Sequence, residues 1–158
     1  PYTACVSPNG RSCEKNWALF RRTDGTVQYV YEWSPLTILD ISGAIISKNT
    51  NVPSWFRHLR GSSCGVRWKN ELWFLTHVVS HVHNAPRIYY HMIVVLNAET
   101  LEYIRNSYLF QFDGEKTVEY ALGMVLEDDS VLISYSKFDC SALIGVYPFG
   151  EFCFMIGL

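Results

Sequence analysis

The chain has no long apolar run and no surplus of positive charge. No apolar stretch approaches the roughly 20 residues that a membrane-spanning helix needs, so the sequence predicts no membrane span. It carries 13 Lys and Arg against 15 Asp and Glu, which gives a formal net charge of -2. This charge supplies no basic field for wrapping a phosphate backbone, and we therefore predict no nucleic-acid partner.

The sequence also lacks paired cysteine spacings and glycosylation sequons. Its five cysteines are odd in number, and no two of them are spaced as C-x-x-C. No Asn-x-Ser/Thr sequon occurs in the chain. These absences indicate mostly reduced structural thiols and favour an intracellular, cytoplasmic compartment. The cysteines are Cys5, Cys13, Cys64, Cys140 and Cys153.

The chain begins at Pro1, with neither a methionine nor a signal-like basic and apolar start. We therefore expect the true N-terminus to lie upstream and the chain to be a fragment or an excised domain. A hydrophobic share of 49% with only 18% charged residues argues against disorder. A length of 158 residues is enough for one domain with a real core.

The apolar residues follow strand periodicity almost throughout, and no long amphipathic helix is evident. Three short runs form a meander, which is followed by a polar loop at 47–53. Four antiparallel strands come next, and a further hairpin with a neighbouring strand closes the chain. The predicted strands are 17–22, 27–33 and 36–41, then 63–68, 71–79, 87–96 and 101–109, and finally 118–126, 131–138 and 142–147.

Turns centred on Asp24, Asn70 and Asp128 recur at intervals of very roughly 50 residues, which is near the size of one β-propeller blade. We therefore predict an all-β fold of antiparallel four-stranded blades in a single β domain over 1–158, with approximate blades at 14–45, 60–110 and 117–158. A closed propeller needs at least four blades, so the chain would be an open part of one. A β-sandwich is the competing architecture, because short strands separated by turns fit it as well.

Two carboxylates are the candidate catalytic groups. Strand alternation places Glu119 on one face with Ala121 and Gly123, whose small size leaves space beside the carboxylate. Such an acid suits a hydroxyl-rich ligand. Asp139 follows the end of the next strand, and two carboxylates on adjacent strands would form the acid and base pair of glycosidic chemistry. The alternatives are a rim Glu paired with an Arg and a turn-capping Asp.

The histidines offer a weaker signal. His77, His81 and His83 have the spacing of a zinc site, but the strand breaks near Ser80 and no acidic or cysteine ligand completes the shell. We therefore predict no metal and no cofactor. His77 and His91 each share a strand face with apolar residues, so each is either a hydrogen-bonded core histidine or one wall of a pocket.

Aromatic residues make up 15% of the chain. Rings of this kind pack against the apolar faces of sugars, while nearby carboxylates and arginines bind the hydroxyls. Most of the rings must fill the core, and we expect only one or two tryptophans to face a ligand. The composition is therefore typical of a sugar site.

The order of several short motifs carries a family resemblance that extends over about 14–147. The chain resembles the β-propeller domains related to glycoside hydrolase family 130, in particular relatives associated with glycosyltransferases in bacteria, algae and giant viruses. The motifs are EKNW at 14–17, YEWSPL at 31–36, RGSS at 60–63, WFLTH at 73–77, RIYYH at 87–91, VVLN at 94–97, VEYALG at 118–123 and LISYSKFD at 132–139.

The resemblance implies a five-bladed propeller with a sugar-binding funnel, in proteins that build, phosphorolyse or hydrolyse glycans. The implied partners are an oligosaccharide, a transferase domain and the propeller blades missing from this chain, which would bring part of the site. Cys140 and Ser141 stand where the family often has charged residues, which argues against phosphate binding. The implied polar lining consists of Glu14, Lys15, Asn16, Arg60, His77, Arg87, His91, Glu119, Tyr120 and Asp139.

Two functional hypotheses follow. The first is a carbohydrate-active domain of a glycosyltransferase-like, glycosidase-like or phosphorylase-like protein, with Glu119 and Asp139 as catalytic acids. Arg60, His77, Arg87 and His91 would then orient hydroxyls or an anionic group. The second is a non-catalytic propeller that docks a glycan or a protein, in a viral particle or beside a transferase domain.

Overall fold

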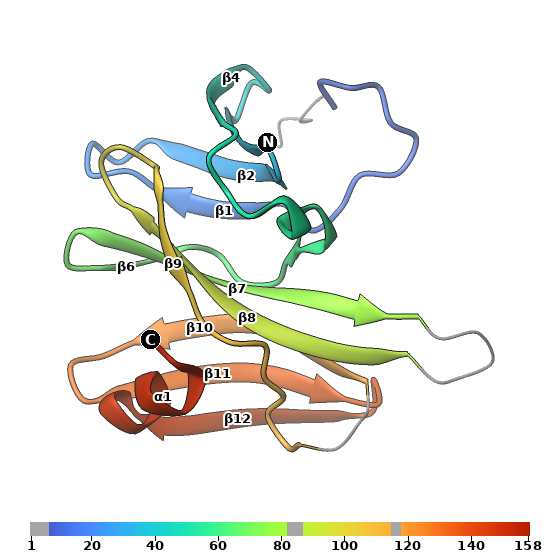
Figure 1. Ribbon diagram of the computed structural model, residues 1–158, viewed down its shortest axis with the longest axis vertical. Helices are drawn as coiled ribbons and strands as arrows, with labels where there is room; N and C mark the ends of the chain where they lie inside the picture. The colour runs from blue at the N-terminus through green and yellow to red at the C-terminus, as the bar shows by residue number, and fades with distance from the viewer. Residues whose placement is uncertain (1–6, 82–86, 115–117) are drawn as a thin grey trace, which may run out of the picture.

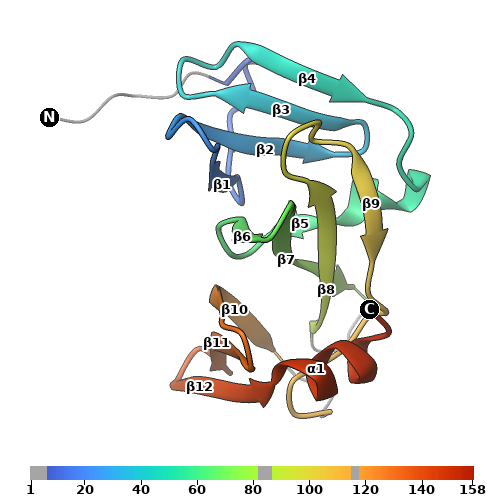
Figure 2. The same ribbon diagram turned by 90° about the vertical axis from the view of Figure 1, so that its left-hand side faces the viewer.

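The computed structural model describes residues 7–81, 87–114 and 118–158. Nearly all of the regular structure is antiparallel β, so the all-β prediction is confirmed. The strands form three sheets that follow one another in chain order and stack from one end of the molecule to the other (Figure 1 and Figure 2). None of the three sheets closes on itself.

The first sheet is a meander of four strands in the order β1-β2-β3-β4. Thr23, Asp24 and Gly25 form the turn between β1 and β2, where Gly25 adopts a φ of 86° and Asp24 accepts hydrogen bonds from Thr26. Ser34 and Pro35, joined by a cis peptide bond, make the turn between β2 and β3. The strands are β1 (Ala18–Arg21), β2 (Val27–Trp33), β3 (Leu36–Asp40) and β4 (Ile45–Asn49).

The central sheet is built on a long hairpin, β7 (Glu71–Ser80) and β8 (Ile88–Asn97), whose strands pair along their full length. On the free side of β7 two short strands share one edge: β5 (Arg60–Gly61) pairs near the end of β7 and β6 (Val66–Trp68) near its start. β9 (Tyr103–Asn106) pairs with β8. Together β5 and β6 act as a single interrupted strand.

The last sheet contains three strands, β10 (Glu119–Leu126), β11 (Ser130–Lys137) and β12 (Ser141–Pro148). An α-helix, α1 (Phe149–Ile156), follows β12 directly and buries Phe152 and Ile156. A 3-10 turn, η1 (Ser54–His58), connects the first sheet to the central one and buries Phe56. Neither described helix is long and apolar enough to cross a bilayer.

Two hydrophobic cores lie on opposite faces of the central sheet. Because side chains alternate along a strand, even-numbered residues of β7 and β8 face the first sheet and odd-numbered residues face the last sheet. The first core joins Phe20, Val30, Trp33, Leu36 and Ile38 to Phe56, Leu72, Phe74, Met92, Val94 and Leu96. The second joins Trp73, Leu75, Ile93 and Val95 to Ala121, Met124, Val131, Ile133, Tyr135 and Phe152.

The structure differs from the sequence prediction at several places, and of the expected strands 63–68 begins only at residue 66 and 101–109 covers only 103–106. The stretch expected to be a polar loop from residue 47 belongs in part to β4, an edge strand whose exposed side chains give no alternation signal. A short helix, α1, ends the chain. A β-bulge between Ala121 and Gly123 shifts the register with β11, so Met124 joins Ala121 in the second core and Gly123 does not.

The outer face of the last sheet carries uncovered apolar side chains. Val125, Ile144 and Val146 are 51%, 72% and 65% exposed, and Leu132 pairs with the first and third of them across the strands. The central sheet, by contrast, is covered on both faces. The outer face therefore has the composition of a surface that another layer would bury.

Gly65 marks the tightest packing in the first core. Its backbone N–H donates to Leu19, and a Cβ at this position would lie 2.6 Å from Cζ of Phe74 and 2.9 Å from Cβ of Phe20. We therefore expect Gly65→Ala to lower the free energy of unfolding by about 1–3 kcal/mol through overpacking. Urea denaturation measures the change.

Gly150→Ala is the matched control, because a Cβ there meets nothing within 4 Å and the residue lies in α1. Alanine is the better helix former, so this variant should be neutral or slightly more stable. Equal destabilisation by the two substitutions would contradict the packing described for Gly65.

Candidate functional site

The segments that lead into the first strands of the first two sheets lie side by side. Asn16 adopts a left-handed conformation with a φ of 65°, and its carbonyl accepts a hydrogen bond from Gly61 N–H at 3.2 Å. Gly61 has no room for a side chain, since a Cβ would lie 3.1 Å from Cβ of Ala18. This contact brings the 14–16 segment next to Arg60.

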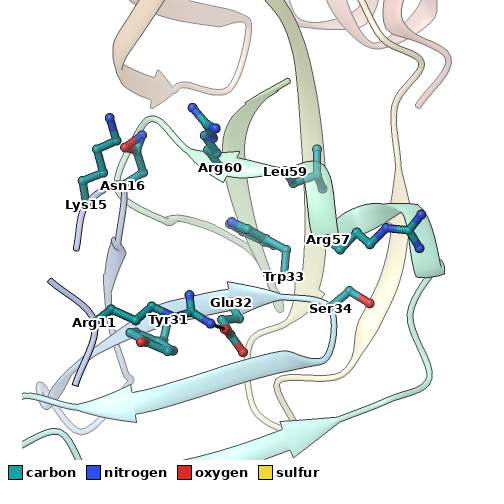
Figure 3. Close-up of a pocket in the computed structure, with 10 residues that line it drawn as sticks. All are labelled: Arg11, Lys15, Asn16, Tyr31, Glu32, Trp33, Ser34, Arg57, Leu59 and Arg60. Atoms are coloured by element: carbon teal, nitrogen blue, oxygen red, sulfur yellow. Dashed lines mark hydrogen bonds and ion pairs between the residues drawn. The ribbon is translucent and has the colours of Figure 1, made fainter. Parts of the chain in front are cut away.

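A cavity of about 350 Å³ opens between these two segments. Figure 3 shows Lys15 and Asn16 on one segment that bounds the cavity and Arg60 on another, and Trp33 lies among the lining residues. We call it the basic cavity, because four of its lining side chains are cationic. Its lining consists of Arg11, Lys15, Asn16, Tyr31, Glu32, Trp33, Ser34, Arg57, Leu59 and Arg60.

The acidic groups around the basic cavity are already paired. Arg11 donates to Glu32 at 2.6 Å, and this bond raises the pKa of the guanidinium. Glu14 accepts hydrogen bonds from Ser7 and from the Tyr31 hydroxyl, which together lower the pKa of its carboxyl. Both hydrogen bonds of Glu14 go to its Oε1 and favour the ionised carboxylate.

The cations of the basic cavity are paired less completely. Among the described residues, Lys15, Arg57 and Arg60 have no carboxylate within ion-pair distance, and all three are exposed. The cavity therefore combines free cationic donors with an amide at Asn16 and aromatic rings at Tyr31 and Trp33.

His77 lies close to this cavity but is buried, with 2% of its surface exposed. Its Nδ1 lies 2.8 Å from the Ser62 hydroxyl, and its ring stacks on Tyr89 and meets Tyr120 edge-on at a centroid distance of 5.2 Å. Burial, together with the charges of Arg60 and Lys15, lowers the pKa of His77 to about 4. The ring is therefore neutral at physiological pH.

Glu119 is also fully buried, and backbone groups satisfy its carboxylate. Its two oxygens accept the backbone N–H groups of Phe112 and Asp113 at 2.9 and 3.1 Å. Nε2 of His91 lies 3.9 Å from the same carboxylate. Glu119 thus holds the segment ahead of β10 against the central sheet, and the space predicted beside it is filled.

His91 is fully buried and has Phe112 at a ring-centroid distance of 4.5 Å. Neither ring nitrogen makes a hydrogen bond to any described residue. Burial is the main cause that lowers the pKa of His91 to about 3, with a smaller contribution from His77. The imidazole is neutral near pH 7, so its contact with Glu119 is not a salt bridge under those conditions.

A polar network that the sequence did not reveal lies beside Glu119. Asp113 accepts hydrogen bonds from the Lys137 ammonium at 2.8 Å and the Tyr135 hydroxyl at 3.1 Å. These contacts lower the pKa of Asp113, and burial is the main cause that raises the pKa of Tyr135 to about 12. The network ties the 112–113 segment to β11.

The predicted site residues thus fall into three groups. Lys15, Asn16 and Arg60 line the basic cavity, with Glu14 beside it through Tyr31. The second group lies between the central and last sheets, where His77, His91 and Glu119 are buried and Tyr120 is partly exposed.

The third group contains the predicted residues that lie elsewhere. Asp139 is exposed in the turn between β11 and β12, with a φ of 55°, and lines a small surface hollow with Ser136 and Cys140. Arg87 is exposed immediately before β8. Neither residue lines the basic cavity.

No metal centre is evident in the parts of the chain that the structure describes. These residues contain no group of three or more His, Cys, Asp or Glu side chains that could hold an ion. His83, one of the three histidines with zinc-like spacing, lies outside the described residues. Cys13, Cys64, Cys140 and Cys153 are free thiols, and Cys5 is not among the described residues.

Sequence reasoning predicted only Lys15, Asn16 and Arg60 of the basic-cavity lining and missed the rest. Tyr31, Glu32 and Trp33 belong to a recognised motif, but the register shift in β2 between Val30 and Glu32 decides which of them face the cavity. Such a bulge is not visible in the alternation of one sequence. Arg11 and Arg57 lie in irregular segments and carry no pattern that marks them.

Comparison of the chain with protein-family models, with curated proteins and with solved structures found no match.

We expect Glu119→Gln to destabilise the fold. The amide can accept one of the two backbone hydrogen bonds but presents its NH2 group to the other donor, so a buried N–H loses its partner. The free energy of unfolding should fall by about 1–3 kcal/mol, measured by urea denaturation at pH 7.

Asp139→Asn is the matched control for this substitution. It makes the same chemical change at an exposed turn, and asparagine tolerates the left-handed conformation. Its effect should stay within about 0.5 kcal/mol. If Glu119→Gln were equally harmless, the two backbone hydrogen bonds would not hold the 112–113 segment.

The two buried histidines should make stability depend on pH. In the unfolded chain they take up protons near pH 6.5, whereas in the folded protein the pKa of His77 is about 4 and that of His91 about 3. At pH values between the folded-state pKa values and 6.5, the unfolded state binds more protons than the folded state. The free energy of unfolding therefore falls as the pH drops below 6.5.

Denaturation at a series of pH values measures this proton uptake. At pH 5.5 the substitution His91→Phe should reduce the number of protons taken up on unfolding by about one relative to the parent chain. An unchanged uptake would show that His91 is not held in the neutral form.

Proposed function

We propose that the chain is a glycan-binding part of a β-propeller protein and that the basic cavity is its sugar site. The observation that carries the proposal is the make-up of this cavity. It gathers Lys15, Asn16 and Arg60, three of the residues that the family resemblance implies, with the rings of Tyr31 and Trp33. Basic and amide donors beside aromatic rings suit a ligand with many hydroxyls.

The available hydrogen-bonding groups match the chemistry of sugar hydroxyls, which both donate and accept. Lys15 and Arg60 supply donors, Asn16 supplies a donor and an acceptor, and Glu32 retains accepting capacity beyond its bond to Arg11. The volume of about 350 Å³ lies within the ordinary range for small-molecule sites. A terminal sugar or a short stretch of a glycan would therefore fit.

The proposed propeller architecture is supported by the arrangement of the sheets. The first strand of the first sheet lies against the interrupted first strand of the central sheet through the hydrogen bonds of Gly61 and Gly65. Figure 2 shows β1, β5 with β6, and β10 near one another, while β4 and β9 lie away from them. Further blades would cover the apolar outer face of the last sheet.

Binding is favoured over catalysis because neither Glu119 nor Glu14, the two described carboxyls considered near the predicted site, has the character of an accessible general acid. Glu119 has no exposed surface, so a substrate reaches it only if the 112–113 segment moves. The pKa of Glu14 is lowered, whereas a general acid near neutral pH needs a raised pKa.

Glycan processing is the second candidate function. It is favoured by one observation, the contact of Glu119 and Tyr120 with the buried histidines His91 and His77. Four of the residues implied by the resemblance are neighbours there, but His77, His91 and Glu119 are buried and only Tyr120 is partly exposed. Catalysis would therefore require this cluster to open.

The binding proposal predicts a selective effect of Asn16→Gly. Glycine removes the side-chain amide, tolerates the φ of 65° and keeps the carbonyl that accepts from Gly61. Screening the folded chain on a glycan array, followed by calorimetric titration of the best oligosaccharide, should show affinity about tenfold weaker for this variant.

The control is Asn51→Gly, in the exposed loop after β4, which should bind as the parent does. Failure of every oligosaccharide to bind the parent would contradict the proposal. Turnover of a bound glycan that Glu119→Gln abolishes without loss of binding would instead favour the second candidate.

A further inference from the structure

The basic cavity adjoins a second cavity, with which it shares lining residues. A second cavity of about 510 Å³ lies on the other side of the segment that runs from η1 to β5, and it is lined in part by His58, His81 and Tyr90. Arg57 and Arg60 line both cavities. Figure 3 shows these two arginines on the same segment, on either side of Leu59. The two cavities therefore meet at a pair of guanidinium groups.

The charge along these joined cavities differs in sign from that of the whole chain. The chain has a formal net charge of -2. The lining of the two cavities contains one carboxylate, Glu32, which is bound to Arg11 at 2.6 Å. Lys15, Arg57 and Arg60 have no carboxylate partner among the described residues. Three unpaired cations thus line one joined hollow.

Several other arginines of the described chain are paired or bonded, whereas Arg87 is exposed and has no ion pair among the described residues. Arg22 and Arg67 both lie within ion-pair distance of Glu99, and Arg21 donates to the carbonyl of Gly25. Like charges that share a concave surface repel each other unless an anion lies between them. The effect of this charge reaches His77, whose pKa is lowered in part by Arg60 and Lys15.

We propose that the glycan bound by this protein is acidic, and that its charged groups bind Arg57 and Arg60 while the chain of sugars runs across both cavities. The inference rests on the proposed glycan-binding function and names its substrate class. A guanidinium presents a planar set of donors that pairs with two oxygens of a carboxylate or sulfate at once. Tyr90 lines the second cavity and is partly exposed, so its ring lies where a sugar would pass.

An acidic sugar fits better than nucleic acid. The free cations are few, and they occupy a joined hollow rather than a stripe along an exposed face. A short glycan that carries a carboxylate or sulfate on every sugar, or on every second sugar, would need only these few cations. An oligonucleotide would meet the acidic remainder of the chain outside the cavities.

The test is calorimetric titration of the whole chain at 50 mM salt with two pentasaccharides, an acidic oligogalacturonate and a neutral cello-oligosaccharide, and with a heparin-derived fragment as the sulfate arm. At least one of the two acidic ligands should bind about tenfold or more tightly than the neutral one. This advantage should shrink at 0.5 M salt, because screening weakens exposed charge pairs.

Arg57→Gln and Arg60→Gln identify the groups responsible. Arg57→Gln should weaken binding of the acidic ligand about tenfold and change binding of the neutral one by less than about twofold. Arg60 also supplies a donor to sugar hydroxyls, so Arg60→Gln should weaken both ligands, and the acidic one by a larger factor. Lys48→Gln removes an exposed cation on β4, away from both cavities, and should change neither. Both arginines are exposed, and thermal denaturation verifies that the variants remain folded.

Three outcomes would overturn the inference. Equal binding of neutral and acidic sugars would remove it while leaving the proposed function standing. Tighter binding of a five-nucleotide single strand, or competition by inorganic phosphate at the same concentration as the acidic sugar, would show that the arginines hold a different anion. Absence of binding by any sugar would instead remove the proposed function itself.

Discussion

The burial of both faces of the β7 and β8 hairpin is the constraint on which the rest of the structure depends. Ten residues in each strand pair without interruption, and their side chains fill two separate cores in alternation. A strand with two buried faces leaves no side for solvent, so the sheets before and after it are both needed to cover it. The stacking of three layers follows from this single hairpin.

Ionisable side chains are stabilised differently inside and outside this stack of sheets. Between the central and last sheets, Glu119 is compensated by backbone donors, and the histidines nearby are neutral. Burial of an ionised group is tolerated only with such compensation. At the basic cavity the cations keep contact with solvent and need no protein partner. The buried carboxylate of Glu119 is thus satisfied by hydrogen bonds, whereas the exposed cations of the basic cavity have no carboxylate partner among the described residues.

The strands could be predicted from the sequence because alternation and turn residues mark them, as the turns near Asp24, Asn70 and Asp128 illustrate. β4 could not, because an exposed edge strand containing Lys48 and Asn49 lacks both signals. The proximity of Lys15, Asn16 and Arg60 was anticipated through the order of motifs. The burial of Glu119 was not, since its donors at Phe112 and Asp113 come from an irregular segment whose path no local pattern encodes.

The order of the sheets in space is the order of their synthesis. The first sheet can complete all of its pairings within residues 18–49, but its core face stays exposed to water until the central hairpin emerges from the ribosome. Each later sheet then packs against a neighbouring sheet that is already formed, so the nascent chain needs to bring together few segments that lie several sheets apart in sequence. During translation the sheets therefore pack one after another, and each completed sheet exposes one apolar face until the next sheet covers it.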